Sequence, residues 1–123
     1  MTKKVISVNE NDPVLNATHK MKDADVGSVV VNKNNRLVGL VTDRDIVLRS
    51  SAMGVSPDTM TCGEVMSTGL VTADPNMDVD EVANLMSSNQ IRRIPVADNG
   101  RVVGMISLAD ITQSRGNSDE AQN

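Results

Sequence analysis

The chain has 123 residues, a formal net charge of −4, a single cysteine and no Phe, Tyr or Trp. This length fits one compact domain or two very small ones, and because a unit of about 60 residues buries too little surface alone, we expect two halves that share one core. The acidic balance argues against general binding to nucleic-acid phosphates. Cys62 excludes an internal disulfide, and no apolar run is long enough for a membrane helix. With an N-terminus too polar for a signal peptide, these features predict a soluble cytoplasmic protein without a membrane partner.

The first predicted elements are a strand and an amphipathic helix. Residues 5–8 are apolar and β-branched enough for a short strand, and Asn11-Asp12-Pro13 is typical of a helix start. The following apolar positions recur at i, i+3, i+4 and i+7 and share one helix face. They are Val14, Ala17, Thr18 and Met21.

A β-hairpin and a second helix are expected next. Ser28–Val31 is a run typical of a buried strand, Asn34-Asn35 favours a tight turn, and residues 36–41 form the returning strand. Thr42 then caps a helix, with Asp45 three residues on.

The whole pattern occurs twice without a gap. Gly39–Ile46 returns 65 residues later as Gly104–Ile111, and Asn99-Gly100 repeats the hairpin turn. Such a repeat predicts two copies of one supersecondary unit. The second helix stripe comprises Val79, Val82, Ala83 and Met86.

This repeat divides the chain into four segments. A short helix is expected to start at Thr61 and lead into the second copy. The proposed segments are repeat one at 1–50, a linker at 51–65, repeat two at 66–113 and a disordered polar tail at 114–123.

Three motifs resemble the cystathionine β-synthase (CBS) domain family. They are the repeated Gly-apolar-apolar-Thr/Ser-x-x-Asp, the run Ile91–Val96 and the run Val65–Thr68. The closest resemblance is to small stand-alone bacterial proteins with two such domains, the arrangement called a Bateman module. It implies an α+β fold, each repeat a three-stranded sheet with two helices, packed as a pseudo-two-fold pair.

The resemblance also implies a function. The family binds AMP, ADP, ATP or sometimes S-adenosylmethionine in clefts between repeats, and usually senses the ligand without chemistry. We therefore expect a regulatory homodimer, not an enzyme, with an adenine nucleotide as regulatory ligand, no prosthetic cofactor, no metal and an effector protein of unknown identity.

The motif residues suit a nucleoside. A carboxylate can accept hydrogen bonds from both hydroxyls of a ribose, which makes Asp45 and Asp110 the candidates, as the family resemblance implies. Thr42 and Ser107 lie one turn earlier, where a hydroxyl and free N–H groups suit a phosphate. The same pattern is also an ordinary helix cap, worth roughly 0.5–2 kcal/mol without any ligand.

The phosphate candidates are arginines, because Arg can grip a phosphate with two parallel donors. The resemblance implies Arg92 and Arg93, and Arg44 is a further candidate in the first copy. Gly27 and Ser28 align with the arginine pair and carry no charge. The two clefts are therefore predicted to bind nucleotides unequally.

The resemblance places the adenine slot on strands of both repeats, where aliphatic and Met side chains must replace aromatic ones. The candidates are Ile6, Leu40, Val71, Pro95 and Met105.

Other interpretations remain open. The arginines could be solvated charges or could bind nucleic acid, although the net charge argues against the latter. The pair could be a scaffold that needs no ligand. His19 falls on a polar helix face and Cys62 is expected to be an ordinary linker thiol, so neither indicates a metal site.

Overall fold

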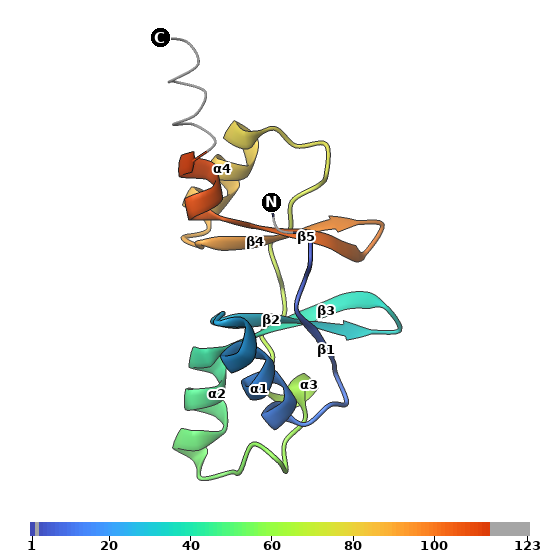
Figure 1. The fold of residues 1–123 in the computed structure, drawn as a ribbon, viewed down its shortest axis with the longest axis vertical. Coiled ribbons are helices and arrows are strands. Elements are labelled where there is room, and N and C mark those ends of the chain that lie inside the picture. Colours follow the sequence, from blue (N-terminus) through green and yellow to red (C-terminus); the bar gives the residue numbers. More distant parts are fainter. Residues whose placement is uncertain (2, 114–123) are drawn as a thin grey trace. The chain divides into compact units, whose positions relative to one another are not determined.

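The computed structural model describes residues 1 and 3–113 and contains two compact units (Figure 1). One comprises Val5–Leu70, and the other comprises Met1–Lys4 with Val71–Asn123. The proposed tail at 114–123 lies outside the described residues. The elements are β1 (Ser7–Asn9), α1 (Val14–Ala24), β2 (Ser28–Lys33), β3 (Arg36–Thr42), α2 (Asp43–Arg49), η1 (Ser51–Met53), α3 (Cys62–Val65), α4 (Val79–Ser88), β4 (Arg93–Asp98) and β5 (Arg101–Ser107).

The unit of the first repeat contains a three-stranded sheet with β2 at its centre. β1 pairs with β2 in parallel, and β3 pairs with it antiparallel. The predicted turn is confirmed: Asn34 and Asn35 have φ values of 50° and 66°, as a two-residue hairpin of this kind requires. Helices α1, α2 and α3 lie on the same side of this sheet (Figure 1).

The core of this unit lies between the sheet and those helices. Of the stripe predicted for α1, Val14, Ala17 and Met21 are buried and Thr18 is half-buried. Cys62, expected to be an ordinary linker thiol, proves to be a core residue. The buried cluster consists of Val8, Val14, Ala17, Met21, Val29, Val31, Val41, Cys62 and Val65.

The segment between the repeats is partly helical. The short helix predicted to start at Thr61 is present as α3. Its start is stabilised by a reciprocal cap, in which the Thr61 side chain accepts a hydrogen bond from the Glu64 N–H and the Glu64 carboxylate accepts one from the Thr61 N–H. At α1 the expected cap differs: Pro13 occupies the cap position, and Asp12 accepts from the Asn9 N–H at 2.9 Å instead.

The second unit has a smaller sheet than the resemblance implies. β4 and β5 form an antiparallel pair closed by Asn99-Gly100, both with positive φ. The third strand is reduced to one parallel bridge between Ala73 and Val96. Residues 108–113 are helical and follow β5 directly.

Two prolines account for the missing strand. In the first unit the N–H groups of Val30 and Glu10 donate hydrogen bonds of 3.1 and 3.0 Å at the two ends of β1. The aligned residues of the second repeat are Pro95 and Pro75, which have no N–H. The ladder therefore cannot extend beyond the bridge.

The second unit has a core of its own, where the sequence led us to expect one shared core. The buried residues are Ala73, Val82, Met86, Ile94, Val96 and Ile111. Of the stripe predicted for α4, Val82 and Met86 are buried and Ala83 packs against the core, whereas Val79 is 41% exposed. Within the described residues, no helix has the length and apolar character needed to cross a membrane.

Candidate functional site

The Ser107–Asp110 pair lies where β5 turns into the helical residues 108–113. The Ser107 N–H donates to Asp110 Oδ2 at 2.9 Å, and the Asp110 N–H donates to Ser107 Oγ at 3.2 Å. The reciprocal cap predicted from the motif is thus confirmed.

The Asp110 carboxylate is half-buried and ionised at neutral pH. The hydrogen bond from the Ser107 N–H is the main cause that lowers its pKa below the ordinary value, and the positive charge of Arg93 acts in the same direction. Its second oxygen accepts no hydrogen bond from the residues that the structure describes. A charged acceptor is therefore free to bind a ligand hydroxyl.

The aligned pair of the first unit has the same cap but different surroundings. The Thr42 N–H donates to Asp45 Oδ2 at 3.0 Å, and the Asp45 N–H donates to Thr42 Oγ1 at 3.1 Å. Ser67 Oγ also donates to Asp45, at 3.0 Å to Oδ1 and 3.3 Å to Oδ2. Arg49 Nη1 lies 4.0 Å from Asp45 Oδ1, and Asp45 is 8% exposed.

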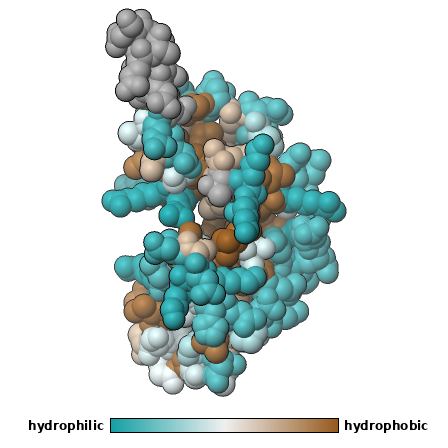
Figure 2. Space-filling view, viewed as in Figure 1, coloured by the Kyte–Doolittle hydropathy of each residue, from teal (hydrophilic) through white to brown (hydrophobic). Residues whose placement is uncertain are grey.

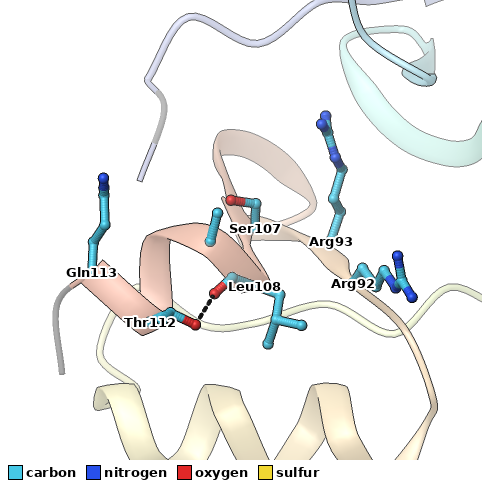
Figure 3. Close-up of a pocket in the computed structure, with 7 residues that line it drawn as sticks. Arg92, Arg93, Ser107, Leu108, Thr112 and Gln113 are labelled. Carbon is cyan, nitrogen blue, oxygen red and sulfur yellow. Dashed lines mark hydrogen bonds between the residues drawn. The ribbon is translucent and has the colours of Figure 1, made fainter. Parts of the chain in front are cut away.

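A basic pocket of about 520 Å³ adjoins the Ser107–Asp110 pair. The two arginines lie on one side of it and Gln113 on another (Figure 3). Arg93 is directly opposite Ser107 in the β4–β5 register, and the Arg92 carbonyl accepts from the Leu108 N–H at 2.8 Å. The pocket is lined by Arg92, Arg93, Ser107, Leu108, Ala109, Thr112 and Gln113.

The described residues that line this pocket include two cations and no acid, so the pocket attracts anions. The aligned surface of the first unit differs. Gly27 replaces Arg92, and a Cβ at Gly27 would lie 3.3 Å from the carboxylate of Asp43. Arg44 is exposed, and its backbone N–H donates to Asp43 Oδ1 at 2.8 Å. The cationic pair is thus a property of the second unit.

Among the adenine-slot candidates, Leu40 and Met105 occupy aligned positions. Leu40 pairs with Val30 across the first sheet, and Met105 pairs with Pro95 across the second. The strand residues on either side of Val30 and Pro95 lie in the cores, so these pairs face the opposite side of each sheet.

The other two slot candidates lie elsewhere. Ile6 packs against the core of the first unit and Val71 against the core of the second. Within each unit, the structure therefore does not bring them to the sheet face that carries Leu40 or Met105.

Asp110 itself lines a second, smaller cavity of about 140 Å³. Met1, Met77 and Val79 contribute apolar surface that was not anticipated from the sequence. One signal in the sequence could have indicated this exposed apolar surface. The first turn of α4 is rich in acidic residues, and such a turn predicts that the start of the helix, including Val79, is exposed. The lining residues are Met1, Met77, Asp78, Val79, Val82, Ile106, Asp110 and Ile111.

Metal ligands do not gather in the part of the chain that the structure describes. No group of three or more His, Cys, Asp or Glu side chains there could hold a metal ion. His19 is exposed on α1, and Cys62 is buried.

Comparison with known proteins identifies close relatives. The sequence model of the CBS domain matches residues 1–52 and 62–116. The chain is 38% identical over 121 residues to the CBS domain-containing protein YhcV of Bacillus subtilis (strain 168), covering 98% of this chain and 86% of that protein. It is 36% identical over 110 residues to Hypoxic response protein 1 of Mycobacterium tuberculosis (strain ATCC 25618 / H37Rv), covering 89% and 77%.

Solved structures of related proteins have a similar fold. The crystal structure of Hypoxic Response Protein I with two coordinated zinc ions gives a TM-score of 0.83 at 35% identity and covers 92% of each chain. A hexameric CBS-CP12 protein from bloom-forming cyanobacteria gives 0.75 at 32% identity, covering 91% of this chain and 66% of that one.

Proposed function

Because the chain belongs to the CBS domain family, we propose that it is a regulatory module that binds an adenosine-containing ligand such as AMP, ADP or ATP and does no chemistry on it. One observation carries the proposal: Asp110 is a half-buried, ionised carboxylate with a free oxygen, next to a pocket that holds two arginines. Such a site recognises a diol and an anion on the same molecule.

Asp110 is proposed to bind the ribose. Its free oxygen accepts one hydroxyl hydrogen, and its other oxygen, bonded to the Ser107 N–H, has a lone pair left for the second. Hydrogen bonds to an ionised carboxylate contribute about 1.5–3 kcal/mol each.

Arg92, Arg93 and the Ser107 hydroxyl are proposed to bind the phosphate. Ser107 links the two groups, because its N–H and hydroxyl bond to Asp110 while its side chain lines the arginine pocket. Guanidinium groups suit this task because they donate two parallel hydrogen bonds.

The adenine is proposed to lie on the aliphatic surface of Met105 and Pro95. These two side chains pair across β4 and β5 on the sheet face opposite the core. A polarisable thioether adapts to a flat ring where no aromatic side chain exists.

Calorimetric titration with adenosine and with AMP tests the proposal. Asp110→Asn is expected to lower the affinity for both adenosine and AMP by about ten- to a hundredfold, since it removes the charge from the carboxylate that accepts the diol hydrogen bonds. The double variant Arg92→Ala/Arg93→Ala is expected to lower the affinity for AMP by about tenfold or more and to leave the affinity for adenosine unchanged.

Matched controls lie at the far end of the same hairpin, where Asp98 and Arg101 pair across the strands and are exposed. Asp98→Asn changes the net charge as Asp110→Asn does, Arg101→Ala removes one of the two charges that the double arginine variant removes, and both controls should leave both affinities unchanged. Wild-type protein that binds no adenosine, AMP, ADP, ATP or S-adenosylmethionine would reject the proposal.

A second candidate function is that of a scaffold that assembles without a ligand. It is favoured by exposed apolar side chains on α2 and η1, among them Val47, Leu48 and Met53. In either case we propose a homodimer with a separate effector protein, in keeping with the self-assembly stated for the CBS-CP12 relative. Partner binding that persists in Asp110→Asn and is independent of nucleotide would favour the scaffold.

A further inference from the structure

The smaller cavity of the second unit, which we call the Met1–Val79 cavity, corresponds to a place that helix α3 fills in the first unit. Met1 aligns with Met66, the residue that directly follows α3. Gly39 and Gly104 are aligned as well, and a side chain at either position would collide with the methionine of its own unit. The two units therefore correspond closely at this point, and their difference lies in what covers it.

In the first unit, α3 closes the core over the start of α1. Cys62 and Val65 are fully buried there and belong to one core cluster with Val14, which is 0% exposed. The aligned Val79 begins α4 as Val14 begins α1, yet it is 41% exposed. Apolar surface that the first unit buries under α3 is thus left open in the second.

The backbone around the cavity also has groups that the first unit pairs with residues 60–63. Three hydrogen bonds of 2.8 Å join that segment to one N–H and two carbonyls, those of Val14, Asp12 and Glu10. The aligned groups of the second unit form no hydrogen bond with the residues that the structure describes. They are the Val79 N–H and the carbonyls of Met77 and Pro75. These groups can pair with a segment that approaches as residues 60–63 do.

The charge at the cavity indicates how such a segment must differ from the chain's own. In the first unit the Leu15 N–H donates to the Pro57 carbonyl at 2.9 Å, so the residues leading into α3 pass beside Leu15. The residue aligned with Leu15 is Asp80, and Asp78 lines the cavity. A segment that passes here therefore gains from a basic side chain where the first unit has Asp58.

Two segments of this chain are unsuited to the cavity. Helix α3 is held in the core of the first unit through Cys62 and Val65. The sequence 114–123 has one apolar side chain, Ala121, and so cannot offer two of them three positions apart.

We propose that the Met1–Val79 cavity is the docking site for a short segment of another polypeptide. This segment forms a single helical turn with two apolar side chains three positions apart, as Cys62 and Val65 are in α3. A basic side chain precedes the turn and lies beside Asp78 and Asp80. Docking buries Val79 and pairs the three backbone groups, and it does not depend on a nucleotide.

A fusion tests whether the cavity accepts such a turn. Residues 57–65 are added directly before Met1 of the full chain, as they stand directly before Met66. The fusion is expected to raise Tm by about 3–6 °C and to slow exchange of the Val79 amide at least tenfold. A control fusion with Cys62→Ser/Val65→Ser in the added copy should do neither. If both fusions unfold and exchange as the wild-type chain does, the proposal fails.

Free peptides test docking from another polypeptide, in nucleotide-free protein followed by NMR. The probes are the peptide of residues 57–65 and its Asp58→Lys variant. The Asp58→Lys peptide is expected to bind at least threefold more tightly than the other, by a margin that shrinks at high salt.

Val79→Ser is expected to weaken binding of the Asp58→Lys peptide by about fivefold, because two methyl groups leave the contact. Val103→Ser is the matched control, since Val103 is 38% exposed on β5 and does not line the cavity. Absence of binding by both peptides at millimolar concentration, or equal losses in the two serine variants, would overturn the proposal even if the fusion is stabilised.

Discussion

Cys62 shows how burial fixes the chemistry of a single residue. It begins α3 and is fully buried in the core of the first unit, where its Sγ donates a weak hydrogen bond to the Pro13 carbonyl at 3.5 Å. Burial, together with the negative charge of Asp12, raises the pKa of the Cys62 thiol to about 11. The thiolate is the reactive form, so the folded protein holds an inert thiol at neutral pH.

This raised pKa predicts a loss of stability in alkali. The unfolded chain ionises its thiol near the ordinary value of 9.0 while the folded chain does not. The stabilisation is therefore fully present below pH 9 and is lost as the pH rises toward 11, by about 1.4 kcal/mol per pH unit at most. Urea unfolding between pH 7 and 11 measures it.

Cys62→Ala removes the titrating group and is the control, because its unfolding free energy should fall less steeply over the same range. Rapid reaction of native Cys62 with a thiol reagent at pH 8 would contradict the buried, neutral thiol. A rate that rises only when the protein unfolds is the expected result.

Local residue roles were predictable where the partners are close in sequence. The Thr42–Asp45 and Ser107–Asp110 caps follow from a three-residue spacing. The Ser67–Asp45 bond joins residues 22 positions apart, so no local pattern indicates it. The two aspartates therefore looked equivalent in the sequence. In the structure they have different hydrogen-bond partners.

At the scale of elements, the third strand of a repeat depends on two backbone N–H groups that the second repeat lacks. The apolar pattern correctly predicted strands and hairpins, because side-chain burial and turn residues depend on local chemistry. It did not exclude the third strand of the second sheet, which depends on donors that Pro95 and Pro75 lack. The exposure of Val79 was likewise missed, since its position on the helix matches that of the buried Val14.

Pro95→Val is predicted to restore one bond of this ladder. The new N–H at position 95 should donate to the Val71 carbonyl, as the Val30 N–H does to Ile6 at 3.1 Å. The gain of about 0.5–1.5 kcal/mol is offset by the lost rigidity of proline, about 0.4–1 kcal/mol, so total stability should change little.

Amide hydrogen exchange is therefore the measurement. The amide at position 95 is expected to exchange at least tenfold more slowly than exposed amides, and Pro75→Glu, which restores the residue aligned in the first repeat, should add a second protected amide. Free exchange at position 95 would show that something other than the prolines prevents the strand.

At the scale of the whole chain, the two repeats differ in their surface chemistry. The first unit carries exposed apolar side chains on α2 and η1, with Val47 56%, Leu48 48% and Met53 71% exposed. Apolar side chains gather over α2 on the face shown in Figure 2. The residues aligned with Val47 and Leu48 are Thr112 and Gln113, so the second repeat has no such surface there.

An apolar helix face on an otherwise charged protein favours contact with a second copy, and this gives the last prediction. The wild-type chain, of 13.1 kDa, should measure twice that mass by light scattering. Leu48→Glu places a charge in the contact and should shift the mass to the monomer value at low micromolar concentration, whereas Gln113→Glu, the aligned change in the second repeat, should not. A monomeric wild-type protein would contradict the prediction, and a dimer that survives Leu48→Glu would move the contact to another surface.

Because the arginine pocket and Asp110 belong to the second unit while this surface belongs to the first, Leu48→Glu should leave AMP affinity unchanged if the two functions are separate, and lower it if assembly and nucleotide binding are thermodynamically coupled.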